Sequence, residues 1–222
     1  MPLPMVHFGV AIKYSESIDV PATFFLGNIA PDAIHMRKNT NRQDKSFTHF
    51  AVNEIVDISS LENTYRKYVL RNQDRDWEWF VRGYFAHVLT DYYWLHSVYK
   101  NFKNKVLNEN LTKEENRSIY YQETDQIDYN LYHTKGWKDT VWNQLIQTKV
   151  YNFEPFLSFD EINFWRLRTL HWFDLISDEP LVQPKYITEK QVNDFIEETT
   201  EHIKRILKEW DSKLFEEVSN IS

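Results

Sequence analysis

The sequence predicts an all-α fold, a single bundle of several helices around a buried central helix. Turn-forming residues are scarce, with 4 glycines and 7 prolines among 222 residues, whereas folds rich in tight turns need more of both. Apolar residues recur at helical spacing over long stretches. The chain also carries 8 Trp, 13 Tyr and 15 Phe, which is too much apolar surface to leave in water. Together these observations predict a large, packed helical core.

Local signals give the order of the helices. Two short helices are expected first, over 5–15 and 21–30, followed by a polar, exposed loop over 32–47. Capping boxes, in which a hydroxyl and a later Glu or Gln satisfy free backbone N–H groups, mark helix starts. They occur at Ser59 with Glu62, Thr112 with Glu115, Ser158 with Glu161, and Thr188 with Gln191. Beyond the helix that starts near Ser59, helices are expected over 76–107, 112–133, 137–149, 158–177 and 188–218.

The helix expected over 76–107 differs from the others. It is apolar nearly all round between Trp77 and Tyr99, which is typical of a helix buried at the centre of a bundle. The last helix has one apolar and one charged face, as expected of a helix that packs on the outside of the core. No repeat, low-complexity tract or linker interrupts the chain, so we expect one domain over 1–222.

Charge and cysteine content narrow the function. The formal net charge is -7, which argues against a protein that binds nucleic-acid backbones in general. Cysteine is absent, so any metal must be held by His, Asp, Glu or backbone oxygen. The longest uncharged stretch near the N-terminus, 20–31, is too short to cross a bilayer, and the first residues have no features of a signal peptide. We therefore expect no transmembrane segment and a cytoplasmic protein, of open oligomeric state.

Three polar residues are predicted to face the core. His87 and Asp91 are four residues apart on the most apolar helix, so they share one face. Taken alone, this pair also fits a simple hydrogen bond within the core. Asp128 falls on the core-facing stripe of its own helix, where an unpaired carboxylate is costly to bury. Its partner is expected to be either a metal ion or a Tyr or Trp donor.

The N-terminal part adds three more residues of this kind. His7, Asp32 and His49 each stand among apolar neighbours, and each alone could be a satisfied core or cap residue. Together with the other three they form a set of imidazoles and carboxylates that suits Zn, Mn or Fe at a site with two or more ions. His35, His96, Glu123 and Asp125 are left as open candidates for the same site.

The order of these residues resembles the zinc-dependent phospholipase C family. The resemblance rests on His7, Asp32 within GNIAPD, His49 within THF, and GYFAHVLTD with His87 and Asp91. It covers roughly residues 5–130 and is strongest to the short bacterial members of unknown substrate; the fungal single-strand nucleases share that all-helical fold. The resemblance implies that His7, Asp32, His49, His87 and Asp91 are metal ligands and that Asp32 is a candidate general base.

Two departures from the family pattern change the expected number of ions. The secreted relatives use a processed amino-terminal Trp as a ligand, whereas this chain begins MPLP. They also supply a His-x-x-x-Glu pair, and Thr124 and Asp128 stand in its place here. Asp128 can replace the Glu, but the His is missing, so two Zn²⁺ ions are expected rather than three.

The resulting prediction is a metal-dependent hydrolase of phosphate esters, a phosphodiesterase or phosphomonoesterase similar to phospholipase C. Its substrate is expected to be a small phosphate ester or a phospholipid. Two alternatives remain open at this point: a metal-binding helical protein without catalytic activity, and a nuclease specific for single strands.

Overall fold

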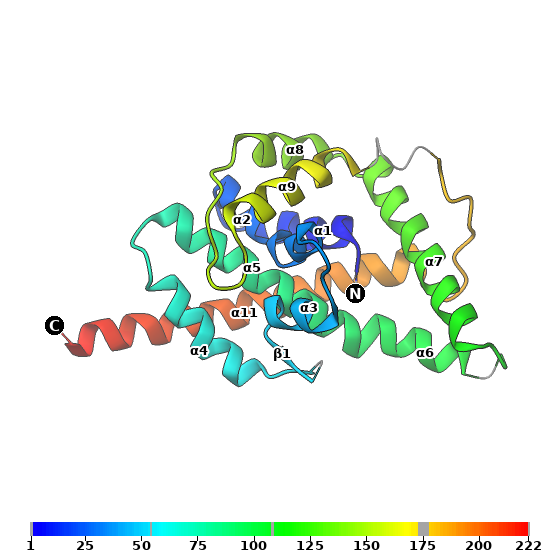
Figure 1. The fold of residues 1–222 in the computed structure, drawn as a ribbon, viewed down its shortest axis with the longest axis horizontal. Helices are drawn as coiled ribbons and strands as arrows, with labels where there is room; N and C mark the ends of the chain where they lie inside the picture. The colour runs from blue at the N-terminus through cyan, green and yellow to red at the C-terminus, as the bar shows by residue number, and fades with distance from the viewer. Residues whose placement is uncertain (1, 54, 108, 173–177, 222) are drawn as a thin grey trace.

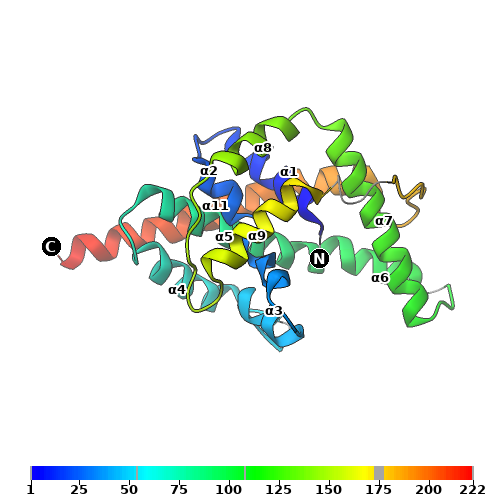
Figure 2. The ribbon, with the colours of Figure 1, turned by 45° about the horizontal axis from the view of Figure 1, so that its top comes forward.

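A computed structural model describes residues 2–53, 55–107, 109–172 and 178–221, with side chains described as far as Leu214. Helices make up most of this part of the chain (Figures 1 and 2). They are α1 (Pro4–Ser15), α2 (Ala22–Gly27), the 3-10 helix η1 (Ala30–Met36), α3 (Arg42–Thr48), α4 (Ile58–Val69), α5 (Arg75–Trp94), the π-helical turn η2 (Leu95–Tyr99), α6 (Lys100–Val106), α7 (Lys113–Thr134), α8 (Lys138–Gln147), α9 (Phe159–Leu170) and α11 (Glu189–Ile221). Two-residue strands β1 (Ala51–Val52) and β2 (Ile55–Val56) form a small antiparallel hairpin. The predicted all-α class is confirmed.

The central helix is also confirmed. α5, η2 and α6 follow one another without a break from Arg75 to Val106, close to the expected 76–107. Most side chains between Trp77 and Trp94 are buried. α1, α2, α4 and α11 all pack against α5, so its middle turns lie at the centre of the bundle. Polar groups on those turns are therefore removed from water on every side.

Two glycines let α2 and α5 touch backbone to backbone. A Cβ added to Gly83 would lie 2.1 Å from the Phe24 carbonyl oxygen, and one added to Gly27 would lie 2.1 Å from the Phe80 carbonyl oxygen. Neither position has room for a larger residue unless the helices separate. Because α2 lies this close to α5, the segment that follows it is carried directly over the turn of α5 that bears His87.

Three of the four predicted capping boxes are present, at Thr112, Ser158 and Thr188. The one predicted at Ser59 is wrong. The carboxylate of Asp57 caps α4 instead, accepting hydrogen bonds from the backbone N–H groups of Ser59 and Ser60. Asp is a strong N-cap, and it starts the helix at Ile58.

The segment 32–47 is the predicted exposed loop only over 37–41, between two helices. It continues η1 and then forms most of α3, which starts with a capping box between Asn41 and Asp44. α3 ends at Thr48, with His49 as its C-cap residue, so Lys45 lies one turn before His49. Many polar residues of this segment therefore belong to a short helix. The side chains of Lys45 and His49, at its C-terminal end, point toward the core.

The remaining expectations concern the C-terminal half and the membrane. α9 ends at Leu170, and the last part of the helix expected over 158–177 lies outside the described residues. Among the helices described, none combines the length and the apolar character needed to cross a membrane. The assignment of 1–222 to one domain stays a prediction.

Candidate metal centre

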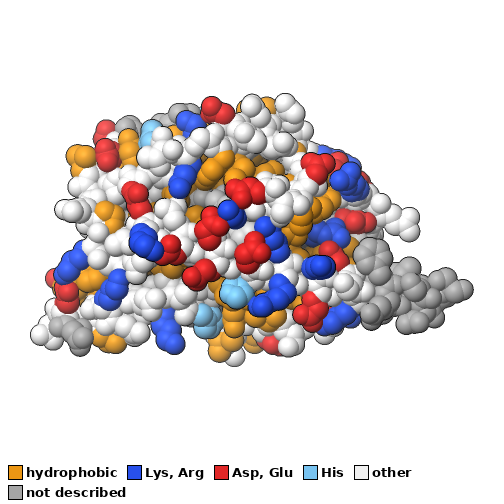
Figure 3. Space-filling view, turned by 180° about the vertical axis from the view of Figure 1, so that it is seen from behind, with side chains coloured by type: hydrophobic (Ala, Val, Ile, Leu, Met, Phe, Trp, Pro, Cys, Tyr) orange, Lys and Arg blue, Asp and Glu red, His pale blue; other side chains and the backbone are white. Residues whose placement is uncertain are grey.

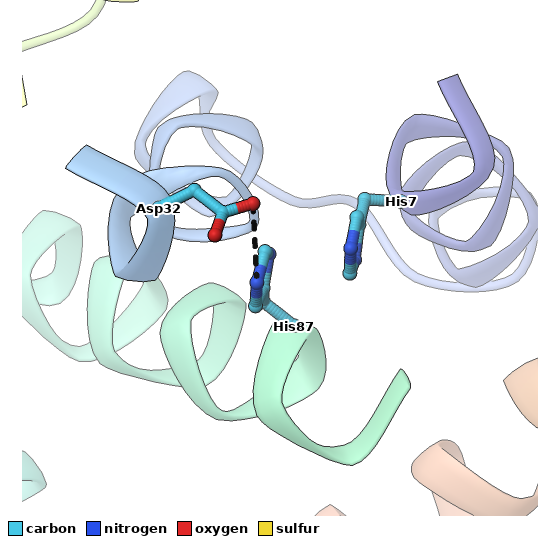
Figure 4. A group of neighbouring side chains, drawn as sticks. All are labelled: His7, Asp32 and His87. Atoms are coloured by element: carbon cyan, nitrogen blue, oxygen red, sulfur yellow. Dashed lines mark ion pairs between the residues drawn. The ribbon is translucent and has the colours of Figure 1, made fainter. Parts of the chain in front are cut away.

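Four separate segments bring five of the predicted residues together. His7 lies on α1, Asp32 on η1, His49 at the end of α3, and His87 and Asp91 one turn apart on α5. Their ligand atoms form two overlapping groups, His7 with Asp32 and His87, and His49 with His87 and Asp91. Figure 4 shows the first group: His7 and His87 lie side by side, and the Asp32 carboxylate approaches His87 from η1.

His87 stands at the centre of the cluster and is fully buried. Its Nδ1 atom lies 2.8 Å from the Asn28 carbonyl oxygen, to which it donates a hydrogen bond. This bond leaves Nε2 without a proton and turned toward the cluster. Burial, followed by the nearby His7, lowers the pKa of His87 to about 3. A neutral imidazole with a free Nε2 lone pair is the form that binds a metal.

His49 is oriented in the same manner. Its Nδ1 atom lies 2.9 Å from the Lys45 carbonyl oxygen, one turn back on α3. The second nitrogen, Nε2, lies 3.3 Å from Nε2 of His87. Since each ring donates from Nδ1 to a backbone carbonyl, two lone pairs face each other at this distance. A metal ion bound by both nitrogens would remove the repulsion between these lone pairs.

The spacing of the donor atoms fits a tetrahedral site. Ligands that bind one ion at about 2.0–2.2 Å lie about 3.3–3.6 Å from one another. His49 Nε2 lies 3.5 Å from Asp32 Oδ1 and 3.4 Å from Asp91 Oδ2. His87 Nε2 lies 3.9 Å from Asp32 Oδ2 and 3.8 Å from Asp91 Oδ2. His49 therefore has both carboxylates at ligand spacing and His87 has both slightly farther away, while Asp32 and Asp91 belong to different groups of mutually close donor atoms.

Asp91 and His7 supply the strongest sign that the cluster could hold a cation. Both carboxylate oxygens of Asp91 and both ring nitrogens of His7 are buried and make no hydrogen bond. Asp91 Oδ1 and His7 Nε2 lie 3.5 Å apart, outside hydrogen-bond geometry. Burial acts to raise the pKa of Asp91, but the surrounding imidazoles outweigh it and hold the pKa below its usual range. A buried carboxylate that stays ionised without hydrogen bonds is costly unless a cation neutralises it.

Asp32 forms the side of the cluster that reaches solvent. Its side chain keeps 13 % of its surface exposed, and Oδ1 accepts a hydrogen bond of 2.8 Å from the Lys45 ammonium. Burial acts to raise the pKa of Asp32, but Lys45 and the nearby His49 and His87 outweigh it and hold the pKa well below its usual range. The carboxylate is thus ionised and accessible from outside.

The structure does not bring Asp128 into this cluster. Its side chain is buried, as the stripe on its helix predicts, but Oδ1 accepts a hydrogen bond of 2.9 Å from the backbone N–H of Met5. That N–H belongs to the first turn of α1, where backbone donors have no partner within the helix. Burial raises the pKa of Asp128 well above its usual range. Its observed partner is therefore a helix end rather than an imidazole or one of the expected Tyr or Trp donors.

Of the four open candidates, one lies next to the cluster. His35 Nε2 is 3.8 Å from Asp32 Oδ1 and 3.3 Å from the Lys45 ammonium. Glu123 is buried elsewhere, where its carboxylate accepts backbone hydrogen bonds from residues 185–187. Asp125 and His96 are exposed. Lys45 was not among the site residues predicted from the sequence. Its position one turn before His49 was the one feature that pointed to the cluster.

No family model, no curated protein and no solved structure matches this chain. The geometry of the cluster therefore carries the functional argument.

Proposed function

We propose that the protein is a metal-dependent hydrolase of phosphate esters, with zinc as its first metal. The observation that supports this most is the buried group His49, His87 and Asp91, whose donor atoms lie close enough together to hold one ion, with Asp32 next to both histidines. Neither carboxylate oxygen of Asp91 has a hydrogen-bond partner, which supports a cation bound next to it. The resemblance of the ligand order to the zinc-dependent phospholipase C family points to the same chemistry.

The donors suggest how a second ion is held. His87 offers only Nε2, because Nδ1 is used by Asn28, so it can bind a single ion. A second ion would be held by His7 and Asp91, which face each other across the buried side of the cluster. Nitrogen and oxygen donors of this kind also accept Mn²⁺ or Fe.

Asp32 is the proposed general base. A bound divalent ion would lower the pKa of a water molecule and offset negative charge on a phosphoryl group. Asp32 is ionised and partly exposed, so it can orient that water and accept its proton. The water oxygen then bonds to phosphorus as the bond from phosphorus to the leaving alcohol oxygen breaks, and solvent returns a proton to that oxygen. His7 and Asp91 hold the buried side and exclude water from it.

A small phosphate ester or a phospholipid headgroup is the proposed substrate. The single-strand nuclease remains the second candidate because the resemblance includes that fold. The net charge of -7 does not favour it. On the face drawn in Figure 3, acidic and basic side chains of the described residues are interspersed and form no continuous basic track. The third candidate, metal binding without catalysis, makes the same prediction for metal content and a different one for turnover.

One experiment separates these candidates. Purified protein is analysed for bound metals and then assayed with p-nitrophenyl phosphate, bis-p-nitrophenyl phosphate, a phosphocholine ester and a single-stranded oligonucleotide. We expect zinc and hydrolysis of a small ester that is lost in Asp32→Asn and kept in the surface control Glu198→Gln. Bound zinc without turnover of any substrate would favour the non-catalytic candidate, and cleavage of the oligonucleotide alone would favour the nuclease.

A further inference from the structure

Lys45 brings a positive charge to the solvent side of the metal centre. Its ammonium lies 2.8 Å from Asp32 Oδ1 and 3.3 Å from His35 Nε2. The side chain is 26 % exposed, so the ammonium lies between the buried cluster and water. An anion that approaches Asp32 from outside therefore comes within reach of this group.

The backbone of the same residue fixes this position. The Lys45 carbonyl accepts hydrogen bonds from both the backbone N–H and the Nδ1–H of His49. Lys45 thus orients one predicted ligand through its backbone and contacts another, Asp32, through its side chain. Its ammonium is held by the contacts with Asp32 and His35, so little entropy remains to be lost when it binds an anion.

Lys45 still has capacity to bind. An ammonium has three N–H donors, and within the described part of the chain two of them have acceptors, on Asp32 and His35. A fixed ammonium beside a divalent cation is repulsive, so Lys45 would weaken a site that only held a structural ion. An anion bound to both groups removes that repulsion. The position of Lys45 therefore fits a site that receives an anion.

The charge around the cluster indicates which anion fits. One divalent ion balances the carboxylates of Asp32 and Asp91 and leaves the charge of Lys45 in excess, and a second ion would add to that excess. Arg168 lies farther out, with its guanidinium over Trp165, whose ring is 5.8 Å from that of His35. The excess positive charge favours a dianion over a monoanion.

We propose that Lys45 forms an anion-binding position beside Asp32 that selects dianionic phosphate groups, so that the substrates are phosphate monoesters rather than diesters. This inference rests on the metal centre and on the proposed hydrolase function. The Lys45 ammonium donates to a non-bridging phosphoryl oxygen, with the third of its N–H groups. A diester has one negative charge and therefore gains less from the same site.

The test measures binding of orthophosphate to zinc-loaded protein by calorimetry, together with zinc content. Lys45→Met keeps the stem of the side chain and removes its charge, and Lys45→Arg keeps the charge. Lys38→Met is the matched control, because Lys38 is an exposed lysine on the segment between η1 and α3. We expect Lys45→Met to weaken phosphate binding about tenfold or more, while Lys45→Arg and Lys38→Met stay within about threefold of wild type. Zinc content of Lys45→Met should equal or exceed that of wild type.

The outcomes separate this inference from the proposed function. Equal phosphate affinity in Lys45→Met and wild type at equal zinc content overturns the inference, as does zinc-loaded wild type that binds no phosphate. Protein that binds phosphate through Lys45 but cleaves no ester contradicts the hydrolase function and leaves the anion site standing. In active protein, Lys45→Met should raise KM for a monoester about tenfold and change KM for a diester less. An equal change in KM for the monoester and the diester would contradict the proposed selectivity.

Discussion

The Nε2 atoms of His49 and His87 lie 3.3 Å apart, and both rings donate from Nδ1 to a backbone carbonyl. With Nδ1 protonated in each ring, the two Nε2 lone pairs face each other and could bind the same cation. Asp32 and Asp91 complete the surroundings, and each contacts both of these histidines. Substitutions of three residues test this arrangement. Asp91 is a proposed ligand, Asp128 is a buried acid outside the cluster, and Gly83 lies at the contact between α2 and α5 that positions the cluster.

Asp91→Asn should reduce metal binding and any phosphoesterase activity together. Asn keeps the size of the side chain but offers one neutral oxygen in place of a charged carboxylate that faces three histidines. We expect metal affinity to fall at least about tenfold, measured as zinc retained after dialysis against a weak chelator. Glu198→Gln, on the exposed face of α11, should change unfolding free energy by less than about 0.5 kcal/mol and zinc content not at all. Equal zinc in wild type and Asp91→Asn would remove Asp91 from the site.

Asp128 should make the metal-free protein less stable as pH rises. Burial raises the pKa of this carboxyl in the folded state, so the folded protein binds the proton more tightly than the unfolded chain. The favourable contribution is complete below the unfolded pKa, near 3.8, and is lost as pH rises through the folded pKa. Asp128→Asn keeps an oxygen for the Met5 N–H and should stabilise the protein at neutral pH. The gain is about 1.4 kcal/mol for every tenfold difference in proton affinity between the folded and unfolded states.

Urea unfolding of wild type and Asp128→Asn between pH 4 and pH 8, both without metal, measures this difference. The gap between the two proteins should widen as pH increases. A gap that stays constant would show that Asp128 titrates normally. The same variant also tests the expectation that Asp128 is a ligand, since zinc content should then fall; the hydrogen bond to Met5 predicts that it does not.

Gly83→Ala should damage the metal centre although Gly83 binds no metal. The added Cβ would lie 2.1 Å from the Phe24 carbonyl oxygen, so α2 must move away from α5. That movement shifts the Asn28 carbonyl from His87 and Asp32 from the cluster. We expect a loss of about 1–3 kcal/mol of unfolding free energy and weaker zinc binding.

Gly136→Ala provides the matched control for this change. A Cβ at Gly136 meets nothing within 4 Å, and the residue does not have a positive φ. The substitution should therefore be neutral or slightly stabilising. Normal stability and zinc binding in Gly83→Ala would mean that the contact between α2 and α5 does not position the site.

The sequence was informative where local pattern decides the structure. All-round apolarity identified the central helix, and helical spacing placed His87 and Asp91 on one face. The convergence of His7, Asp32 and His49 on that face depends on contacts between helices distant in sequence, which no local pattern encodes. The resemblance to a known family supplied that grouping instead.

The differences from prediction have physical causes. Lys45 was missed because it stands in a polar stretch that reads as solvent-exposed, yet a short helix turns it inward. Asp128 was correctly expected to be buried, but burial alone does not identify a partner. A backbone N–H at a helix end supplies a partner for Oδ1 of Asp128, while Oδ2 is buried without a hydrogen bond.

The most direct test of the account is a zinc titration of metal-free wild type and His87→Gln by calorimetry. Gln keeps a polar side chain of similar length but has no imidazole nitrogen to place between Asp32, His49 and Asp91. We expect tight binding by wild type and affinity at least about 100-fold weaker in His87→Gln, because losing a ligand costs at least as much as losing a residue that only orients one, which costs about 10–100-fold. Wild type that binds no zinc, or His87→Gln that binds it equally well, would contradict the metal centre.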